Sequence, residues 1–145
     1  MGKKRIAAKG GPNKSGNALK SRTLSRGSKR KLTDGVLQVQ STYNNTRVSV
    51  ADADGNIVFT SSAGALGFKG AKKGTPFAAA KVGELIGEQA MGAGLKEVDI
   101  VVKGVGAGRE SAIRSFIGKG INIRTIQDKT PVPHNGPKAP KPRRV

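Results

Sequence analysis

Three segments in the first half of the chain alternate apolar and polar residues, which is the pattern of half-buried β-strands. They span residues 36–43, 46–52 and 56–61. In the second segment, Val48 and Val50 are expected to face inward. The connections, residues 44–45 and 53–55, contain Asn and Gly, which accept the backbone angles of tight turns. The pattern therefore predicts an antiparallel meander of three strands.

A helix is predicted over residues 76–91, because apolar residues recur there at helical spacing. The apolar stripe consists of Ala79, Val82, Ile86 and Ala90, with Leu85 beside them. Thr75 can accept a hydrogen bond as the N-cap, and Pro76 suits the first helical position, where a backbone N–H would be unpaired. Gly83 and Gly87 weaken the helix, but they allow another backbone to approach it closely.

The rest of the folded part suits two right-handed parallel crossover units. A nearly continuous β-branched run at residues 98–102 predicts a central strand covered on both faces. Residues 109–117 suit a short helix, and residues 121–126 suit a last strand. The element order is therefore βββαβαβ. It predicts an α/β fold with a mixed five-stranded sheet and two helices packed on it.

Charge divides the chain of 145 residues, whose formal net charge is +18, into three parts. Residues 1–32 hold eleven Lys and Arg and no acid, and their polar composition predicts a disordered basic extension. Residues 131–145 hold four Lys and Arg and five of the seven prolines, which predicts a stiff, extended basic arm. Residues 33–130, with twelve basic and nine acidic side chains, form the predicted globular domain.

This excess of positive charge indicates a polyanionic partner, and nucleic acid is favoured over a merely solubilising role for the N-terminal extension. The chain has no cysteine, which excludes disulfides and thiolate metal sites. Its apolar runs are too short to span a bilayer, and no apolar stretch follows the N-terminal lysines, so a signal peptide is not expected. We therefore expect a cytoplasmic protein without a membrane partner.

The strongest candidate for a binding site is a glycine-rich loop at residues 63–77. It holds Lys69, Lys72 and Lys73 directly before the predicted helix start. Three cations within five residues repel one another unless a polyanion is present, and a helix N-terminus favours anions. The loop therefore predicts a site for phosphates of a polynucleotide. Phe68 is either a small core anchor or a ring on which an exposed base stacks.

A second glycine-rich loop, Gly104-x-Gly106-x-Gly108, connects a predicted strand to a predicted helix. The dinucleotide spacing G-x-G-x-x-G would require glycine at Arg109, and G-x-x-x-x-G-K-[ST] occurs nowhere, so a mononucleotide site is poorly supported. The loop can instead offer backbone N–H groups, and Arg109 a cation, to an RNA or DNA phosphate. The alternative is a connector whose glycines permit tight packing.

Residues suited to catalysis are scarce. The single histidine, His134, lies in the proline-rich arm, where no partner is held beside it for a nucleophile–histidine pair. Two-metal nuclease chemistry needs converging carboxylates, and the first strand contains none. Asp52 and Asp54 suit turns, and Glu84 suits a solvated helix face. We expect no enzyme activity, no metal and no cofactor.

Four motifs follow one another along the chain. They are Tyr43-Asn44-Asn45-Thr46; Gly67-Phe68-Lys69-Gly70 through Lys73-Gly74-Thr75-Pro76-Phe77-Ala78-Ala79; Lys103-Gly104-x-Gly106-x-Gly108-Arg109-Glu110-Ser111-Ala112; and Asp128-x-Thr130-Pro131-x-Pro133-His134-Asn135-Gly136, with the ending Arg143-Arg144-Val145. Together they resemble the small-subunit ribosomal protein eleven family over residues 33–145. The His-Asn-Gly motif and the Arg-Arg-Val ending are similar to its bacterial or organellar branch.

The resemblance implies a ribonuclease-H-like arrangement without nuclease activity and a place on the platform of the small ribosomal subunit. There the family ties together separate helices of the small-subunit ribosomal RNA and lines the Shine–Dalgarno cleft, in which messenger RNA pairs upstream of the start codon. The implied partners are that ribosomal RNA, messenger RNA and small-subunit proteins seven and eighteen. The implied location is a cytoplasmic ribosome in preference to an organellar one. An isoaspartate at Asn135 is also implied.

The residues predicted to bind RNA lie in the turn between the first two strands, in the two glycine-rich loops and in the C-terminal arm. They are Asn44, Asn45, Phe68, Lys69, Gly70, Lys72, Lys73, Thr75, Gly106, Gly108, Arg109, His134, Asn135, Gly136, Lys138, Lys141, Arg143 and Arg144. For Asn44 and Asn45 the turn alone is a sufficient explanation. The alternative function is that of a free-standing, nonspecific nucleic-acid-binding protein.

Overall fold

β1 is the middle strand of the sheet, and the other strands lie on both sides of it. The computed structural model describes residues 31–144, in which the strand order is β3-β2-β1-β4-β5. The elements are β1 (Asp34–Ser41), β2 (Thr46–Ala51), β3 (Ile57–Ser62), the 3₁₀ helix η1 (Gly70–Gly74), α2 (Pro76–Gly92), β4 (Glu97–Lys103), α3 (Arg109–Ile117) and β5 (Asn122–Asp128). β1, β2 and β3 pair antiparallel, whereas β4 pairs parallel with β1 and β5 parallel with β4. The predicted mixed five-stranded sheet is confirmed.

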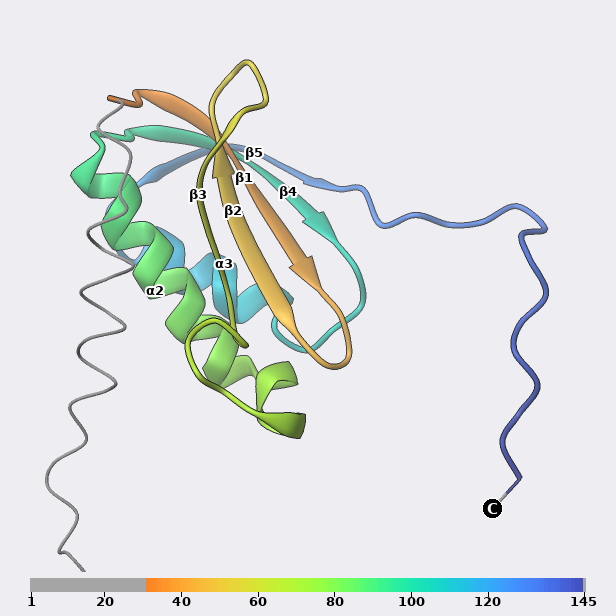
Figure 1. Ribbon diagram of the computed structural model, residues 1–145. Helices are drawn as coiled ribbons and strands as arrows, with labels where there is room; N and C mark the ends of the chain where they lie inside the picture. Colours follow the sequence, from red (N-terminus) through yellow and green to blue (C-terminus); the bar gives the residue numbers. More distant parts are fainter. Residues whose placement is uncertain (1–30, 145) are drawn as a thin grey trace, which may run out of the picture.

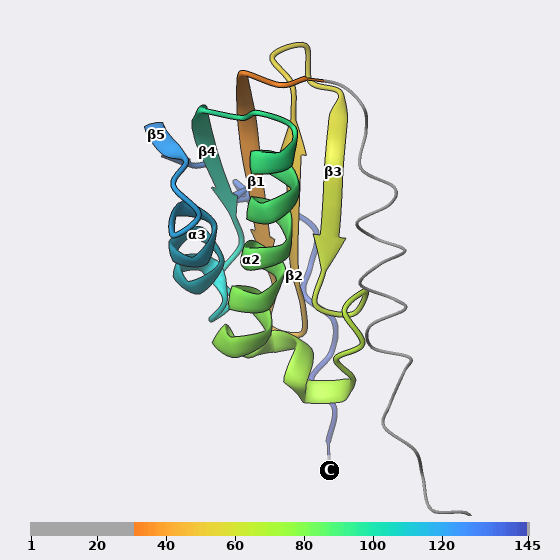
Figure 2. The same ribbon diagram turned by 90° about the vertical axis from the view of Figure 1, so that its left-hand side faces the viewer.

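Both helices cover the same face of the sheet (Figures 1 and 2). The connection from β3 to β4, which contains α2, and the connection from β4 to β5, which contains α3, step across the sheet in the same direction. Right-handed crossovers in one direction place their helices on one side of the sheet. β4 accordingly alternates: Val98, Ile100 and Val102 are buried, whereas Asp99 and Val101 are partly exposed. The prediction that this strand is covered on both faces is wrong, because among residues 31–144 no helix lies on its second face.

The core lies between the sheet and the two helices. Its fully buried large side chains include Leu37, Val39, Val48, Val50, Val82, Ile86, Val98, Ile100 and Phe116. Burying each such side chain contributes roughly 1.5–3 kcal/mol, so this layer dominates the stabilisation of the fold. All five residues of the predicted apolar stripe on α2 are buried. The two helices pack closely because Gly83 lies against the backbone of Ala112, where a Cβ would clash.

Two differences from the predicted elements have a physical reason. β1 ends at Ser41 rather than at Tyr43, because the Thr42 N–H donates to the Asn45 carbonyl (2.8 Å) and so closes the turn to β2. The sequence pattern also missed η1, which lies directly before α2. A single turn of 3₁₀ helix has no room for a hydrophobic period, and η1 buries none of its residues.

The two ends of the described chain differ. Most of the predicted N-terminal extension, residues 1–30, lies outside the described residues. Leu32, which the charge pattern places in that extension, is buried, and its N–H donates to the Ala93 carbonyl (3.0 Å). Residues 131–144 form no helix or strand, are exposed throughout, and run away from the sheet beyond β5 (Figure 1). Within the described residues, no helix is long and apolar enough to cross a membrane.

Candidate nucleic-acid interface

Three connections meet at the end of the sheet where β1 and β4 terminate. They are the β1–β2 turn (residues 42–45), residues 63–75, called the lysine loop below, and residues 104–108, called the glycine loop. A Cβ at Gly74 would clash with the Tyr43 carbonyl, and a Cβ at Gly106 would clash with the Thr42 carbonyl. Both loops therefore pack directly on the turn, and only glycine permits an approach this close.

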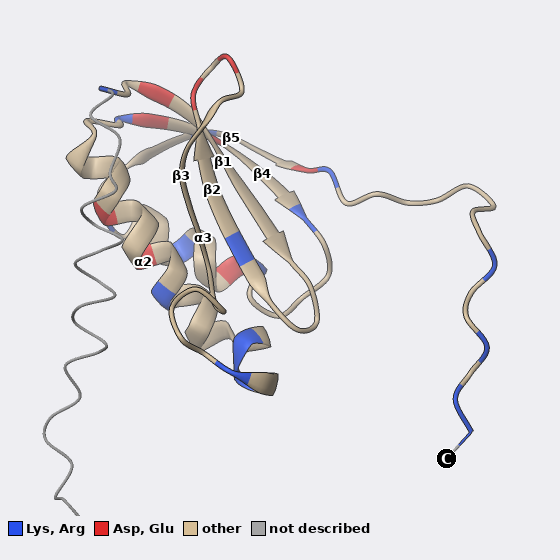
Figure 3. Ribbon diagram, viewed as in Figure 1, with Lys and Arg blue, Asp and Glu red and all other residues tan. Residues whose placement is uncertain are grey.

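The lysine loop presents its cations without acidic partners. Lys69 and Lys72 are exposed, and Lys73 is partly exposed. Among residues 31–144, none of the three lysines forms an ion pair, and neither η1 nor the first turn of α2 contains an acid. Figure 3 shows this basic segment beside the start of α2. Because neighbouring unpaired cations repel one another, the loop is suited to a polyanion.

Thr75 caps α2, as the sequence predicts. Its hydroxyl accepts the Ala78 N–H (3.4 Å) and donates to the Lys72 carbonyl (2.7 Å), so it joins η1 to α2. Pro76 occupies the first helical position, which is also as predicted. Gly70 begins η1 with a φ of 60°, in the left-handed region that favours glycine. The lysines thus stand before a helix N-terminus, whose free N–H groups and partial positive charge also favour an anion.

Phe68 serves in packing. It is partly buried against the core, and its ring stands edge-on to that of Phe77, with the centroids 6.1 Å apart. The core-anchor alternative is therefore favoured for Phe68. Phe77 itself is 65% exposed, and the Lys81 ammonium lies 5.8 Å from the centroid of its ring. Sequence reasoning missed this exposed ring, although its offset from the apolar stripe of α2 was an available signal.

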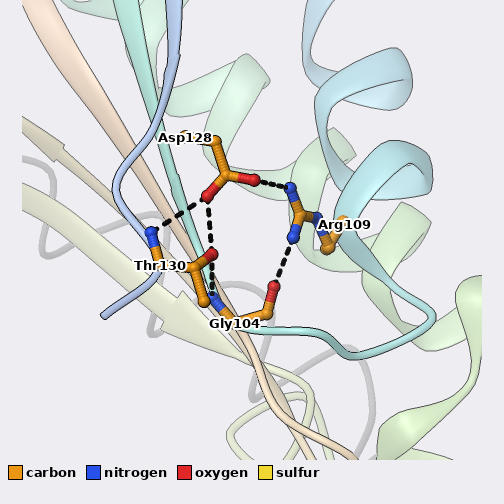
Figure 4. A network of polar contacts seen from close by, with 4 residues as sticks. All are labelled: Gly104, Arg109, Asp128 and Thr130. Carbon is orange, nitrogen blue, oxygen red and sulfur yellow. Dashed lines mark hydrogen bonds and ion pairs between the residues drawn. The ribbon is translucent and has the colours of Figure 1, made fainter. Parts of the chain in front are cut away.

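The glycine loop has two of its glycines packed inward, whereas Val105 and Ala107 are exposed. Gly106 and Gly108 are buried, so neither presents its backbone at the surface. The Arg109 guanidinium donates to the Gly104 carbonyl (2.6 Å) and to the Asp128 carboxylate (2.5 Å) (Figure 4). The cation predicted to bind a phosphate is therefore already engaged within the chain. These contacts favour the alternative in which the loop is a tightly packed connector.

Asp128 is the centre of a polar network at the point where the C-terminal arm begins (Figure 4). Its carboxylate accepts the Thr130 N–H (2.9 Å) and the Thr130 hydroxyl (2.5 Å), while the Gly104 N–H donates to that hydroxyl (3.2 Å). Hydrogen bonds from Thr130 and then from Arg109 hold the pKa of the Asp128 carboxyl well below its ordinary range. The network fastens the start of the arm to the glycine loop. Sequence reasoning did not find it, because Arg109 and Asp128 are 19 positions apart.

The two asparagines of the β1–β2 turn differ in their exposure. Asn45 closes the turn, because its N–H donates to the Thr42 hydroxyl (3.1 Å) and its carbonyl accepts the Thr42 N–H (2.8 Å). Its side-chain Oδ1 is buried. Asn44 is exposed, and so is its neighbour Tyr43, whose side chain is 80% exposed. Of the two asparagines, Asn44 is therefore the one available to a partner.

The predicted site residues of the C-terminal arm lie outside this cluster of loops (Figure 1). All of them are exposed: His134, Asn135, Gly136, Lys138, Lys141, Arg143 and Arg144. Asn135 has a φ of 54°, as expected for an Asn-Gly turn. The structure thus brings the two loops and the β1–β2 turn together and leaves the arm as a separate cationic segment.

Acidic side chains gather at the opposite end of the sheet, beside Lys31 and Lys96 (Figure 3). Asp34 and Glu97 begin β1 and β4 there, and Asp52 and Asp54 lie in the β2–β3 turn. No three His, Asp or Glu side chains in the described part of the chain come together in a group that could hold a metal ion. The four acidic side chains of this end therefore lie far along the strands from the lysine loop, although Lys31 and Lys96 also lie at this end.

Comparison with known proteins agrees with the motifs. The family model of "Ribosomal protein S11" matches residues 35–144. The chain is also similar to the "Small ribosomal subunit protein uS11" of Acaryochloris marina (strain MBIC 11017), with 50% identity over 124 residues. This alignment covers 86% of the chain and 95% of that relative.

Proposed function

The chain belongs to the ribosomal protein S11 family, and from this premise we propose that the lysine-loop end of its sheet binds small-subunit ribosomal RNA. As a member of this family it is a structural component of the small ribosomal subunit and not an enzyme. The observation that carries the proposal is the set of unpaired cations, Lys69, Lys72 and Lys73, before the N-terminus of α2. Cations and helix N-termini are the groups with which proteins contact phosphates.

The binding energy in this proposal comes mainly from neutralised phosphates. The lysine loop and the two basic ends of the chain release counterions from the RNA when they bind it. Specificity comes from the shape of the RNA and not from base edges, because the rigidly packed loops fit one arrangement of the backbone. Arg109 enters the proposal in a secondary role, since Asp128 already balances its charge.

The finer placement is proposed on the resemblance of the four motifs. The protein lies on the platform of the subunit, bridges separate ribosomal RNA helices, lines the messenger RNA cleft and neighbours small-subunit proteins seven and eighteen. The exposed arm, residues 131–144, suits a bridging role because it extends away from the body beyond β5 (Figure 1). An isoaspartate at Asn135 belongs to the same proposal, and isoaspartyl methyltransferase labelling of the purified protein tests it.

Sedimentation distinguishes this function from the alternative, a free-standing nonspecific nucleic-acid-binding protein. The tagged full-length chain, expressed at its natural level, is followed through sucrose gradients at increasing salt. We expect it to co-migrate with small subunits through moderate salt, because a bound ribosomal protein contacts many phosphates at once. A free pool, or a distribution that follows total nucleic acid, would support the alternative.

A further inference from the structure

Two of the five aromatic side chains are exposed, and both flank the lysine loop. Phe59 and Phe116 are buried, and Phe68 is partly buried. Tyr43 is 80% exposed and Phe77 is 65% exposed. Burying a side chain of this size ordinarily contributes about 1.5–3 kcal/mol to folding, and the exposed position of Tyr43 forgoes that contribution. The fold therefore does not explain why an aromatic residue stands at this place.

The backbone under Tyr43 is firmly held. The neighbouring Thr42 closes the turn with Asn45 through hydrogen bonds of 2.8 and 3.1 Å. Gly74 lies against the Tyr43 carbonyl, and Gly106 lies against the Thr42 carbonyl. A ring on such a support loses little conformational freedom when it binds a flat ligand, which favours affinity.

The ring of Tyr43 is free, unlike that of Phe77. The ring of Phe77 meets Phe68 edge-on and has the Lys81 ammonium beside it. Within residues 31–144, the side chain of Tyr43 makes no ring contact and no hydrogen bond. The element that packs against its backbone is basic, because η1, which ends against Tyr43 at Gly74, carries two lysines and no acid. A flat, uncharged group attached to a polyanion fits this combination.

We propose that Tyr43 is a stacking platform for one unpaired base of the bound RNA, while Lys72 and Lys73 contact phosphates of the same strand. This inference rests on the proposed RNA-binding function. It adds a binding site for one base and a preference for single-stranded RNA. Bases of a duplex are stacked on one another, so the site selects a single-stranded loop, bulge or end. Stacking on an aromatic ring tolerates any base, because every base has a π face.

The chain contains its own probe for this contact. Tyr43 is the only tyrosine and there is no tryptophan, so the intrinsic fluorescence of the full-length protein reports on Tyr43 alone. The protein is titrated with a mixed-sequence single-stranded RNA, with an RNA duplex of equal length and with inorganic polyphosphate. The Tyr43→Phe variant, which lacks the signal, supplies the background, and free N-acetyltyrosinamide titrated with the same RNA supplies the correction for absorption by RNA. Anisotropy of a labelled RNA measures binding independently.

At saturation, we expect the single-stranded RNA to lower the tyrosine emission severalfold. The duplex and polyphosphate neutralise the same cations but offer no free base, so we expect them to bind with little quenching. Binding of the single strand without quenching would overturn the base site and leave the proposed function intact. Quenching of equal size by polyphosphate would also overturn it. Absence of RNA binding at every salt concentration would overturn both proposals.

Variants separate stacking from charge. Tyr43→Leu is expected to weaken binding of the single strand about tenfold at every salt concentration, within the range measured for one stacked base. The log–log salt slope should stay unchanged, since no phosphate contact is lost. Tyr43→Phe keeps the ring and should retain the affinity. A Tyr43→Leu protein with unaltered affinity and unaltered melting temperature would show that the ring has no base partner.

Discussion

The lysine loop and the glycine loop are alike in sequence and different in the structure. Each follows a strand, precedes a helix and contains several glycines, with basic residues inside the lysine loop and on either side of the glycine loop (Lys103 and Arg109). In the lysine loop, Lys69 and Lys72 are exposed and, within the described residues, have no acidic partner. In the glycine loop, Gly106 is buried and the adjoining Arg109 is bound by Asp128. One sequence signal thus produces an exposed cationic surface in one case and an internal support in the other.

The difference arises from the partners that the fold brings to each loop. β5 pairs parallel with β4, so its last residue, Asp128, lies opposite Val102 and close to the glycine loop. No acidic side chain of the described chain is brought to the lysine loop in this way. A loop of glycines and cations is therefore a good phosphate site only where the fold leaves the cations unpaired.

Adding one methyl group to each loop should give the largest contrast. In Gly106→Ala, the new Cβ would clash with the Thr42 carbonyl and the Ser41 hydroxyl. Overpacking of this kind costs about 1–3 kcal/mol. In Gly64→Ala, the nearest atom to the new Cβ is the Lys73 Cδ at 3.6 Å, an ordinary contact. We expect that variant to stay within about 0.5 kcal/mol of the parent protein.

Thermal unfolding measures this contrast, since 1 kcal/mol shifts the melting temperature of a domain of this size by roughly 4–8 °C. Gly106→Ala should melt at a clearly lower temperature, and Gly64→Ala should melt with the parent protein. Equal melting temperatures for all three proteins would show that the glycine loop is not the tight support described above.

Removing one positive charge from the lysine loop, or Arg109 from beside the glycine loop, should give an intermediate effect on RNA binding. Lys72→Gln and Lys73→Gln should each flatten the log–log dependence of RNA affinity on salt by about 0.7–0.9, the amount for one lost phosphate contact. Arg109→Gln should change this slope much less, because Asp128 already neutralises the guanidinium. It should instead lower the melting temperature, since the Gly104 carbonyl of the glycine loop loses the hydrogen bond from the Arg109 guanidinium.

A labelled ribosomal RNA fragment, titrated by anisotropy over a series of salt concentrations, gives the slopes of all three variants. The same proteins are melted as a control for folding. A lysine variant with an unchanged slope would remove the lysine loop from the RNA surface. An Arg109→Gln slope as flat as that of the lysine variants would mean that RNA displaces Asp128 from Arg109.

Local patterns were sufficient to predict most of the fold. The apolar stripe of α2, its cap at Thr75 and the inward-facing Val48 and Val50 depend on spacing between neighbours, and a sequence displays such spacing directly. The covered face of β4 was predicted wrongly, because a β-branched run does not show whether one face or two is covered. Asp99 in the middle of that run was the available signal of an open face.

The site was predicted less completely than the fold. The lysine loop could be found, because its three cations and its helix start are contiguous in the sequence. The inward packing of Gly106 and the ion pair of Arg109 depend on residues that are distant in the sequence and meet only in the sheet. The exposure of Tyr43 had no local signal either, since its alternating segment predicted a strand that continued through it.

The smallest effect should come from the pH dependence of the Asp128 network. Hydrogen bonds from Thr130 and from Arg109 hold the pKa of the Asp128 carboxyl below its ordinary range. A carboxyl whose pKa is lowered by folding stabilises the folded state above its unfolded pKa, which is near 4, and this contribution is lost as the pH falls further. Asp128→Asn removes the titration. The melting temperature of the parent protein should exceed that of the variant at neutral pH, and the gap should close progressively below about pH 4.

Salt sharpens this last test of the glycine loop. The Arg109–Asp128 pair is partly exposed, with the two side chains 30% and 52% accessible, so salt should screen it and reduce the gap between the parent protein and Asp128→Asn at neutral pH. The lowered pKa of the Asp99 carboxyl also makes the folded state less stable at acid pH. This effect is common to both proteins and cancels in the difference between their melting temperatures. A gap of constant size from neutral to acid pH would mean that Thr130 is held by its bond to Gly104 and not by the charge of Asp128. In that case the glycine loop would support the arm through the backbone alone, and Arg109 would be freer to meet a phosphate than its ion pair indicates.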